Sequence, residues 1–186
     1  MAIGSPPDDK YPVRQVLLAD NETIIRGIVE EEWDPDSKRG SPSIFRRPNT
    51  SVTRIDAVGL QAAISLVKRD VEWSGKPARN LRGAGEISVS MLKTVGASPV
   101  PVAKPGPCIH LQVWEEKVAE KDGKPGNDQH AEIVAYDDVE HLKERSSISM
   151  GYSRMLSKAL RVHAVDSEGS IVSVSAPLEW AKAENN

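Results

Sequence analysis

The sequence predicts an α+β fold in a single domain, with a mostly antiparallel sheet of about six strands and two or three helices. Short stretches rich in β-branched residues recur along the chain between turn-forming residues. One longer segment has helical periodicity, and the strict strand–helix alternation of a doubly wound fold is absent. The length of 186 residues is typical of one domain.

The first third of the chain is expected to contain two short strands and a long polar loop. Residues 1–12 contain three prolines and are predicted to be a flexible leader, followed by a globular domain at 13–178 and a polar tail at 179–186. Residues 13–18 suit a short strand or a helical turn, and residues 22–30 suit a strand. A polar loop is expected at 34–49, and a short β-branched stretch at 51–55.

The middle of the chain contains the most clearly predicted helix, at residues 56–70. Seven apolar residues recur there with helical spacing, and Asp56 is suited to cap the N-terminus. A basic, glycine-containing loop is expected at 73–85, and alternating apolar and small polar residues predict a strand at 86–95. Residues 96–107 contain four prolines, which predict an extended loop.

The last third is predicted to complete the sheet. Residues 108–115 and 130–136 are expected to pair as antiparallel strands at its centre, joined by a turn-rich connector. Asp137 and Asp138 suit the cap of a helix that begins at Val139, and Met155, Leu156 and Leu160 have helical spacing further along. Residues 162–165 and 171–174 are expected to form a terminal hairpin.

Composition narrows the classes of function. The formal net charge of −3 disfavours nucleic acid as a partner, because bulk phosphate binding needs a cationic surface. The single cysteine, Cys108, excludes an intrachain disulfide and a cysteine-based zinc cluster. The sequence has neither the apolar core of a signal peptide nor a run of about 18 apolar residues. We therefore expect a cytoplasmic protein without a membrane partner; the oligomeric state stays open.

Several catalytic signatures are incomplete or missing. The triplet His130-Ala131-Glu132 resembles one zinc-deaminase motif, but the two further ligands that such a site needs do not follow it. The four histidines fall on different predicted elements, although His110 and His130 would approach each other if their strands paired. Neither a Gly-x-Ser-x-Gly elbow nor a phosphate-binding P-loop motif occurs. No metal is expected.

A basic segment stands out in this acidic chain. Residues 37–54 contain no acidic side chain and five cationic ones, which are Lys38, Arg39, Arg46, Arg47 and Arg54. Guanidinium groups match the geometry of phosphate oxygens, so this segment predicts a phosphate or nucleotide contact. The alternative is a solvated loop whose charges pair with the preceding run of three glutamates.

Three patches share the order of a known family. They are the expected strand with Arg26-Gly27, the stretch with Thr50-Ser51 ahead of the apolar helix, and Glu132 in a later strand. This order resembles the Arg-Ser-Glu type ADP-ribosyltransferase superfamily. The resemblance implies that Arg26 and Gly27 bind NAD, that Thr50 and Ser51 support the site, and that Glu132 stabilises the oxocarbenium-like state. Arg46 and Arg47 would then hold phosphates.

The resemblance implies an NAD-consuming enzyme, either ADP-ribosyltransferase-like or NAD-glycohydrolase-like, of the kind used as a bacterial toxin or defence effector. His130 stands where arginine-modifying members carry Glu or Gln, and Asn49 stands where serine is usual, so transfer to protein arginine is disfavoured. The NAD hypothesis requires Arg26, Ser51 and Glu132 to line one cleft. The alternative is a non-catalytic protein-interaction module, for which tryptophans in loops and a contiguous apolar patch would be typical.

Overall fold

The computed structural model describes residues 16–47, 49–74, 79–100, 108–121, 123–140 and 143–179. The predicted leader, most of the proline-rich loop and nearly all of the predicted tail lie outside these ranges. The main sheet has eight strands, all antiparallel to their neighbours. Seven of them follow one another in space in this order: β10 (Ile171–Ser175), β9 (Arg161–Val165), β5 (Leu81–Ser88), β1 (Thr23–Val29), β4 (Asn49–Arg54), β7 (His130–Asp138) and β6 (His110–Glu115).

The remaining elements are short strands and five helical segments. The eighth strand, β8 (Lys143–Glu144), pairs with β7, and β2 (Trp33–Asp34) pairs with β3 (Arg39–Gly40) in a separate two-stranded sheet. Two 3-10 turns, η1 (Glu30–Glu32) and η2 (Pro42–Phe45), accompany three α-helices: α1 (Leu60–Ser74), α2 (Val89–Ala97) and α3 (Met150–Ala159). The predicted α+β class is confirmed, with more strands than expected.

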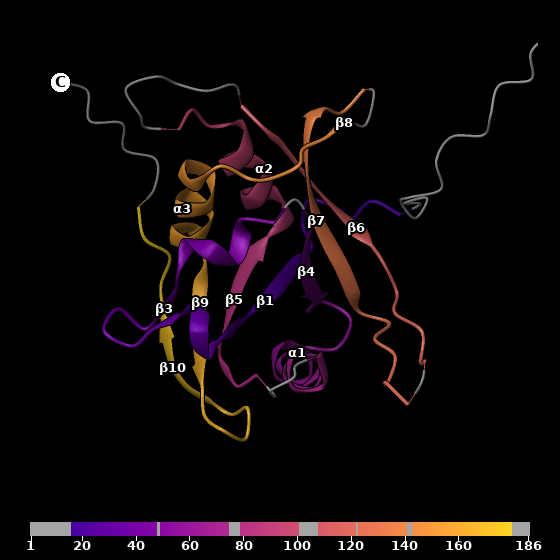
Figure 1. Ribbon diagram of the computed structural model, residues 1–186, viewed down its shortest axis with the longest axis vertical. Coiled ribbons are helices and arrows are strands. Elements are labelled where there is room, and N and C mark those ends of the chain that lie inside the picture. Colours follow the sequence, from indigo (N-terminus) through magenta and orange to yellow (C-terminus); the bar gives the residue numbers. More distant parts are fainter. Residues whose placement is uncertain are drawn as a thin grey trace, which may run out of the picture.

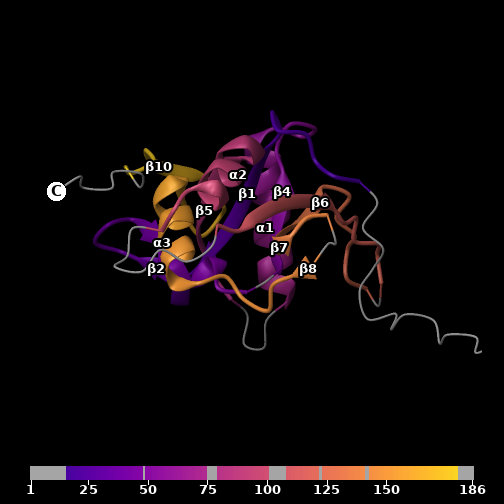
Figure 2. The same ribbon diagram turned by 90° about the horizontal axis from the view of Figure 1, so that it is seen from above.

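The helices cover both faces of the sheet. Figure 1 shows α1 on one side of β1 and β5 and the helices α2 and α3 on the other, and Figure 2 shows the same arrangement from above. Two separate hydrophobic clusters result: a small one between α1 and the sheet, which includes Ile25 and Ile64, and a larger one under α2 and α3, which includes Ile24 and Leu156. Alternate side chains of β1 therefore serve different clusters, as the pleat of a strand requires.

The predicted helix and hairpins have altered bounds. The helix α1 begins at Leu60 rather than at Asp56, because the Asp56 carboxylate accepts a hydrogen bond from the Thr23 amide at 2.8 Å and so fixes the start of β1. The antiparallel pairing of residues 110–115 with 130–136 is confirmed, but β6 is the last strand of the sheet rather than a central one. The terminal hairpin β9–β10 is confirmed.

Two predictions in the middle of the chain are wrong. The expected strand at 86–95 ends at Ser88, whose hydroxyl accepts a hydrogen bond from the Met91 amide at 3.2 Å and caps α2. The N-cap outweighs the short apolar alternation, since Val89, Leu92 and Val95 are all buried on one helical face. The expected loop at 73–85 contains the first half of β5, from Leu81 onward.

A third wrong prediction concerns the segment after β7. The residues described there form β8 at 143–144, not a helix from Val139, and α3 begins only at Met150 after the cap residue Ser149. Asp138 instead accepts a hydrogen bond from the Glu140 amide at 2.8 Å, which holds a turn. None of the helices in the described ranges is long and apolar enough to span a membrane.

Candidate functional site

The sheet separates between β1 and β4. These strands pair only at Ile24 with Arg54 and Ile25 with Thr53, whereas β1 pairs with β5 along its whole length. On its other edge, β4 pairs with β7 over all of residues 49–53. The strands β1 and β4 therefore diverge after the first two pairs, and backbone from both faces the opening.

A pocket of about 320 Å³ occupies this opening. Its volume lies at the lower end of the range of small-molecule sites. The walls come from β1, β4, the second half of α1, the end of η2 and the connector between β6 and β7. The lining residues with polar side chains are Arg26, Arg47, Asn49, Thr50, Ser51, Thr53, Asp70, Arg79, Lys124 and His130.

Positive charge dominates the pocket. Of the described lining side chains, Arg26, Arg47, Arg79 and Lys124 are cationic, and Asp70 is the one carboxylate. Burial lowers the pKa of the Arg26 guanidinium; Glu32 raises it, and the nearby Arg79 and Arg47 lower it further. Arginine stays protonated in proteins, so the lowered pKa of Arg26 means that its positive charge is held in the pocket at an energetic cost.

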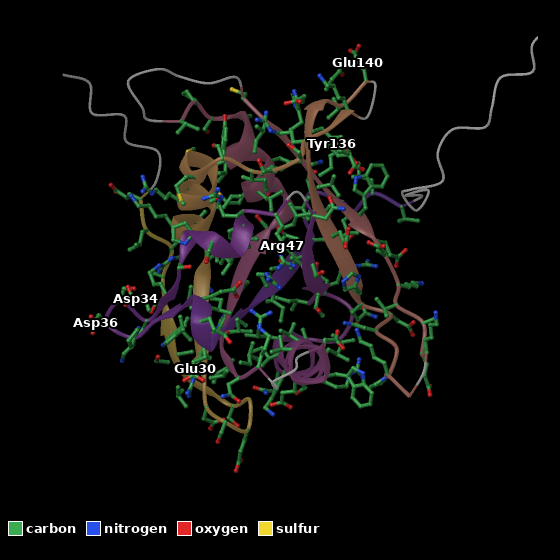
Figure 3. All side chains as sticks on the ribbon, viewed as in Figure 1. Glu30, Asp34, Asp36, Arg47, Tyr136 and Glu140 are labelled. Carbon is green, nitrogen blue, oxygen red and sulfur yellow. The ribbon has the colours of Figure 1, made fainter. Side chains whose placement is uncertain are left out.

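Figure 3 shows where the charges lie. The Arg47 side chain lies over the middle of the molecule, whereas the labelled acidic side chains of Glu30, Asp34, Asp36 and Glu140 lie toward its periphery. Carboxylates do lie near the other two arginines, since Oε2 of Glu31 is 3.8 Å from Nε of Arg79 and Oε1 of Glu32 is 4.0 Å from the Arg26 guanidinium. A bound anion would offset the repulsion among the three arginines.

Two buried polar atoms of the lining residues have no hydrogen-bond partner among the residues that the structure describes. They are Nε of Arg26 and Oγ1 of Thr50, and the Thr50 residue is only 3% exposed. A buried polar atom without a partner costs about 1–3 kcal/mol. The Arg26 Nε–H can only donate, and the Thr50 hydroxyl can donate or accept, so an oxyanion that reaches either atom would supply its missing partner.

The carboxylates near the pocket do not neutralise it. The Oδ2 atom of Asp70 accepts a hydrogen bond from the Asn127 side chain at 2.7 Å, and Oδ1 lies 3.4 Å from the Arg69 guanidinium. Oε1 of Glu32 lies 4.0 Å from the Arg26 guanidinium, at the outer limit of an ion pair. The positive charge of the pocket is therefore only partly compensated.

The structure brings together most of the site residues expected from the sequence. Arg26, Gly27, Arg47, Thr50 and Ser51 all line the pocket. Gly27 is needed there, because a Cβ atom at this position would lie 2.5 Å from Cγ1 of Val67 in α1. Arg46 is exposed and is not among the described lining residues.

Glu132 is also outside the described lining. It pairs with Ser51 on one side and with Trp114 on the other, so its side chain shares the α1 face of the sheet with Ser51. Arg26 pairs with Gly85, whose Cα faces Leu160 in the cluster under α2 and α3. Strand alternation thus directs Arg26 and Glu132 to opposite faces, although the opening gives Arg26 and Ser51 a common pocket. The arrangement that the NAD hypothesis requires, with Arg26, Ser51 and Glu132 in one cleft, is therefore not found among the described lining residues.

Some of the lining residues were not expected from the sequence, among them Arg79, Lys124 and His130. Arg79 belongs to the basic segment before β5 and Lys124 to the connector, and His130 was considered as a metal ligand and as a departure from the family pattern, not as a lining residue. The positive charge of residues 73–85 was a usable signal for Arg79. The sequence has no local signal for Lys124, because its place depends on the Arg69 guanidinium, which donates to the Gly126 carbonyl at 2.7 Å and ties the connector to α1.

The other hypotheses find less support. His110 pairs with Tyr136, at the opposite end of β7 from His130, and the described residues contain no cluster of three or more potential metal ligands. Two arginines that a nucleic-acid-binding surface would use are engaged in ion pairs: Arg54 bonds Glu22 and Glu115, and Arg82 bonds Glu30. The exposed large apolar side chains are spread over several elements, three of them on or just after β10: Val172, Val174 and Leu178.

Comparisons with protein-family models, curated proteins and solved structures found no match for this chain.

Proposed function

We propose that this protein binds a small anionic molecule of the nucleotide type, with its phosphate in the pocket between β1 and β4. The observation that carries this proposal is the convergence of Arg26, Arg47 and Arg79 on a pocket whose one described carboxylate is already engaged. Planar guanidinium groups donate paired hydrogen bonds to phosphate oxygens, which makes phosphate the anion that suits this set best.

The unpartnered donors support the same ligand class. A phosphate oxygen at the base of the pocket would accept from Nε of Arg26 and from the Thr50 hydroxyl, the two atoms that lack acceptors. The mixed lining, with Ile25, Val29 and Val71 beside the polar groups, suits a ligand that also has an apolar part. A nucleotide has both.

The binding proposal is tested by isothermal titration calorimetry with inorganic phosphate, AMP, ADP-ribose and NAD. We expect at least one of the nucleotides to bind, with an affinity that falls as salt is raised because the contact is electrostatic. In Arg26→Gln we expect a loss of about tenfold or more, since a buried charge-assisted hydrogen bond disappears. Absence of binding to all four probes would contradict the proposal.

The chain offers a matched control for the arginines. Arg46 and Arg47 are adjacent and both exposed, but only Arg47 is among the described lining residues. We expect Arg47→Gln to weaken nucleotide binding by roughly threefold to tenfold, and Arg46→Gln to leave it nearly unchanged. Equal losses in the two variants would indicate a non-specific effect of net charge.

NAD is the nucleotide that the family resemblance implies, and the common location of Arg26, Gly27, Thr50 and Ser51 supports it as a candidate ligand. The position of Glu132 does not support it as a substrate, because Glu132 does not share the described lining with Arg26 and Ser51. The cleavage hypothesis predicts release of free nicotinamide from NAD, followed by proton NMR, and loss of that release in Glu132→Gln. Since Glu132 is not among the described lining residues, binding of NAD without cleavage is the competing outcome, and it would leave nucleotide binding as the function.

A further inference from the structure

His130 lies at one end of the pocket, close to three other elements. It is the first residue of β7, it pairs with Thr53 of β4, and it lines the pocket together with Asp70 of α1 and Lys124 of the connector. Thr53 is buried and also lines the pocket, so this end is enclosed by side chains from the sheet, the helix and the connector.

The hydrogen bond of the His130 ring fixes its tautomer. The Nδ1 atom lies 2.7 Å from the carbonyl oxygen of Glu116. A carbonyl oxygen can only accept, so Nδ1 carries the hydrogen and donates it. In the neutral ring the lone pair is then on Nε2, which is a hydrogen-bond acceptor. A second hydrogen bond joins the backbones of the same two residues, since the Glu116 amide donates to the His130 carbonyl at 3.1 Å.

This acceptor differs from the rest of the charged lining. None of the described residues is hydrogen-bonded to Nε2 of His130. Arg26, Arg47, Arg79 and Lys124 are donors only, and the Asp70 carboxylate is occupied by Asn127 and Arg69. The pocket thus combines an anion-binding set of donors with an acceptor whose lone pair is available.

We infer that the ligand carries a hydroxyl group as well as a phosphate, and that this hydroxyl donates to Nε2 of His130. The ligand class is a hydroxylated phosphate ester, such as a nucleotide with free ribose hydroxyls, and not inorganic phosphate or a simple anion. This inference rests on the proposed function, since the phosphate must bind Arg26, Arg47 and Arg79 in the same pocket. His130 is then the residue that distinguishes hydroxylated from dehydroxylated ligands.

The test compares AMP with 2′,3′-dideoxy-AMP by calorimetry. The wild-type protein is expected to bind AMP roughly threefold to tenfold more tightly, the usual worth of one hydrogen bond. In His130→Asn the side-chain amide can still donate to the Glu116 carbonyl, but the Nε2 acceptor is gone, so the preference should vanish while dideoxy-AMP binds as before. His110→Asn, an exposed histidine at the far end of the strand pair, should keep the preference.

The outcomes separate this inference from the proposed function. Equal affinities of the wild-type protein for AMP and dideoxy-AMP would overturn the hydroxyl contact while leaving the phosphate site intact. A preference that persists in His130→Asn, with thermal unfolding unchanged, would assign the contact to another residue and also overturn the inference. Failure of dideoxy-AMP and of all four probes of the binding test, which are inorganic phosphate, AMP, ADP-ribose and NAD, would instead overturn the proposed function and this inference with it.

Discussion

Arg39 shows how a residue in a cationic segment can serve the fold instead of a ligand. Its side chain is 7% exposed, and its guanidinium donates to four carbonyl oxygens at 2.8–3.2 Å, those of Ser157, Lys158, Leu160 and Ala176. Three of these carbonyls belong to the end of α3, where carbonyls lack helical partners and the helix dipole is negative. Burial lowers the pKa of Arg39, and these contacts offset the cost of its charge.

We therefore expect Arg39→Met to lower the free energy of unfolding by about 2–4 kcal/mol, because it leaves several buried carbonyls without donors. Arg39→Lys should recover only part of this loss, since one ammonium cannot reach all four carbonyls in the geometry of a planar fork. The measurement is urea unfolding followed by circular dichroism. Arg154→Met, on the exposed side of α3, is the control and should change stability by less than about 0.5 kcal/mol. A similar loss in both variants would contradict the capping role.

At the same scale, the four arginines of residues 37–54 have different roles. Arg47 lines the pocket, Arg46 is exposed, Arg39 caps α3, and Arg54 joins Glu22 to Glu115 at 2.8 Å each. The charge pattern predicted a phosphate contact somewhere in the segment, but it does not distinguish one arginine of the segment from another. Only the direction of each side chain in the folded chain separates these roles.

At the scale of elements, α1 approaches β1 closely at Gly27. The Cα of Gly27 faces Val67, so the absence of a side chain lets the helix approach the strand and form one wall of the pocket. The smaller hydrophobic cluster packs between the two elements that contain these residues, and it has fewer buried side chains than the larger cluster. A side chain at position 27 would therefore meet Val67 unless α1 moved away from β1.

We expect Gly27→Ala to cost about 1–3 kcal/mol of unfolding free energy, because the added methyl group overlaps Val67 and pushes α1 away from the sheet. The double variant Gly27→Ala/Val67→Ala should be destabilised by less than the sum of the two single variants, since the methyl fills the space that Val67 leaves. Thermal or urea unfolding of all four proteins gives the coupling. Strict additivity would show that the two residues do not control the spacing.

Helix and strand assignment also depended on contacts between elements. The apolar periodicity over 58–67 was strong enough to predict α1, because its seven apolar residues define one face. The segment at 86–95 was ambiguous, since Ile87, Val89 and Met91 suit a strand while Val89, Leu92 and Val95 suit a helix face. The Ser88 hydroxyl that caps α2 resolved it, and a single serine is a weak signal in a sequence.

At the scale of the whole molecule, the site depends on an interruption of the sheet. A continuous antiparallel sheet has no opening for a ligand, because neighbouring strands lie about 4.8 Å apart. Here β1 remains paired with β5, and β4 remains paired with β7. The pocket lies where the half of the sheet that contains β1 separates from the half that contains β4. The halves remain joined by two residue pairs, Ile24 with Arg54 and Ile25 with Thr53, and by α1, which contacts both β1 and β4.

By itself the sequence determined the α+β class, a helix predicted at 56–70 that overlaps α1, the pairing of β6 with β7 and the terminal hairpin. These depend on local periodicity and turn residues, which are properties of neighbouring residues. The tertiary structure alone decided that Arg79, Lys124 and His130 line a pocket with Arg26 and Arg47, that Arg39 caps α3, and that Glu132 lies outside the described lining. The physical reason is that strand order, register and the divergence of β1 from β4 arise from packing between segments far apart in the chain, which no local pattern encodes.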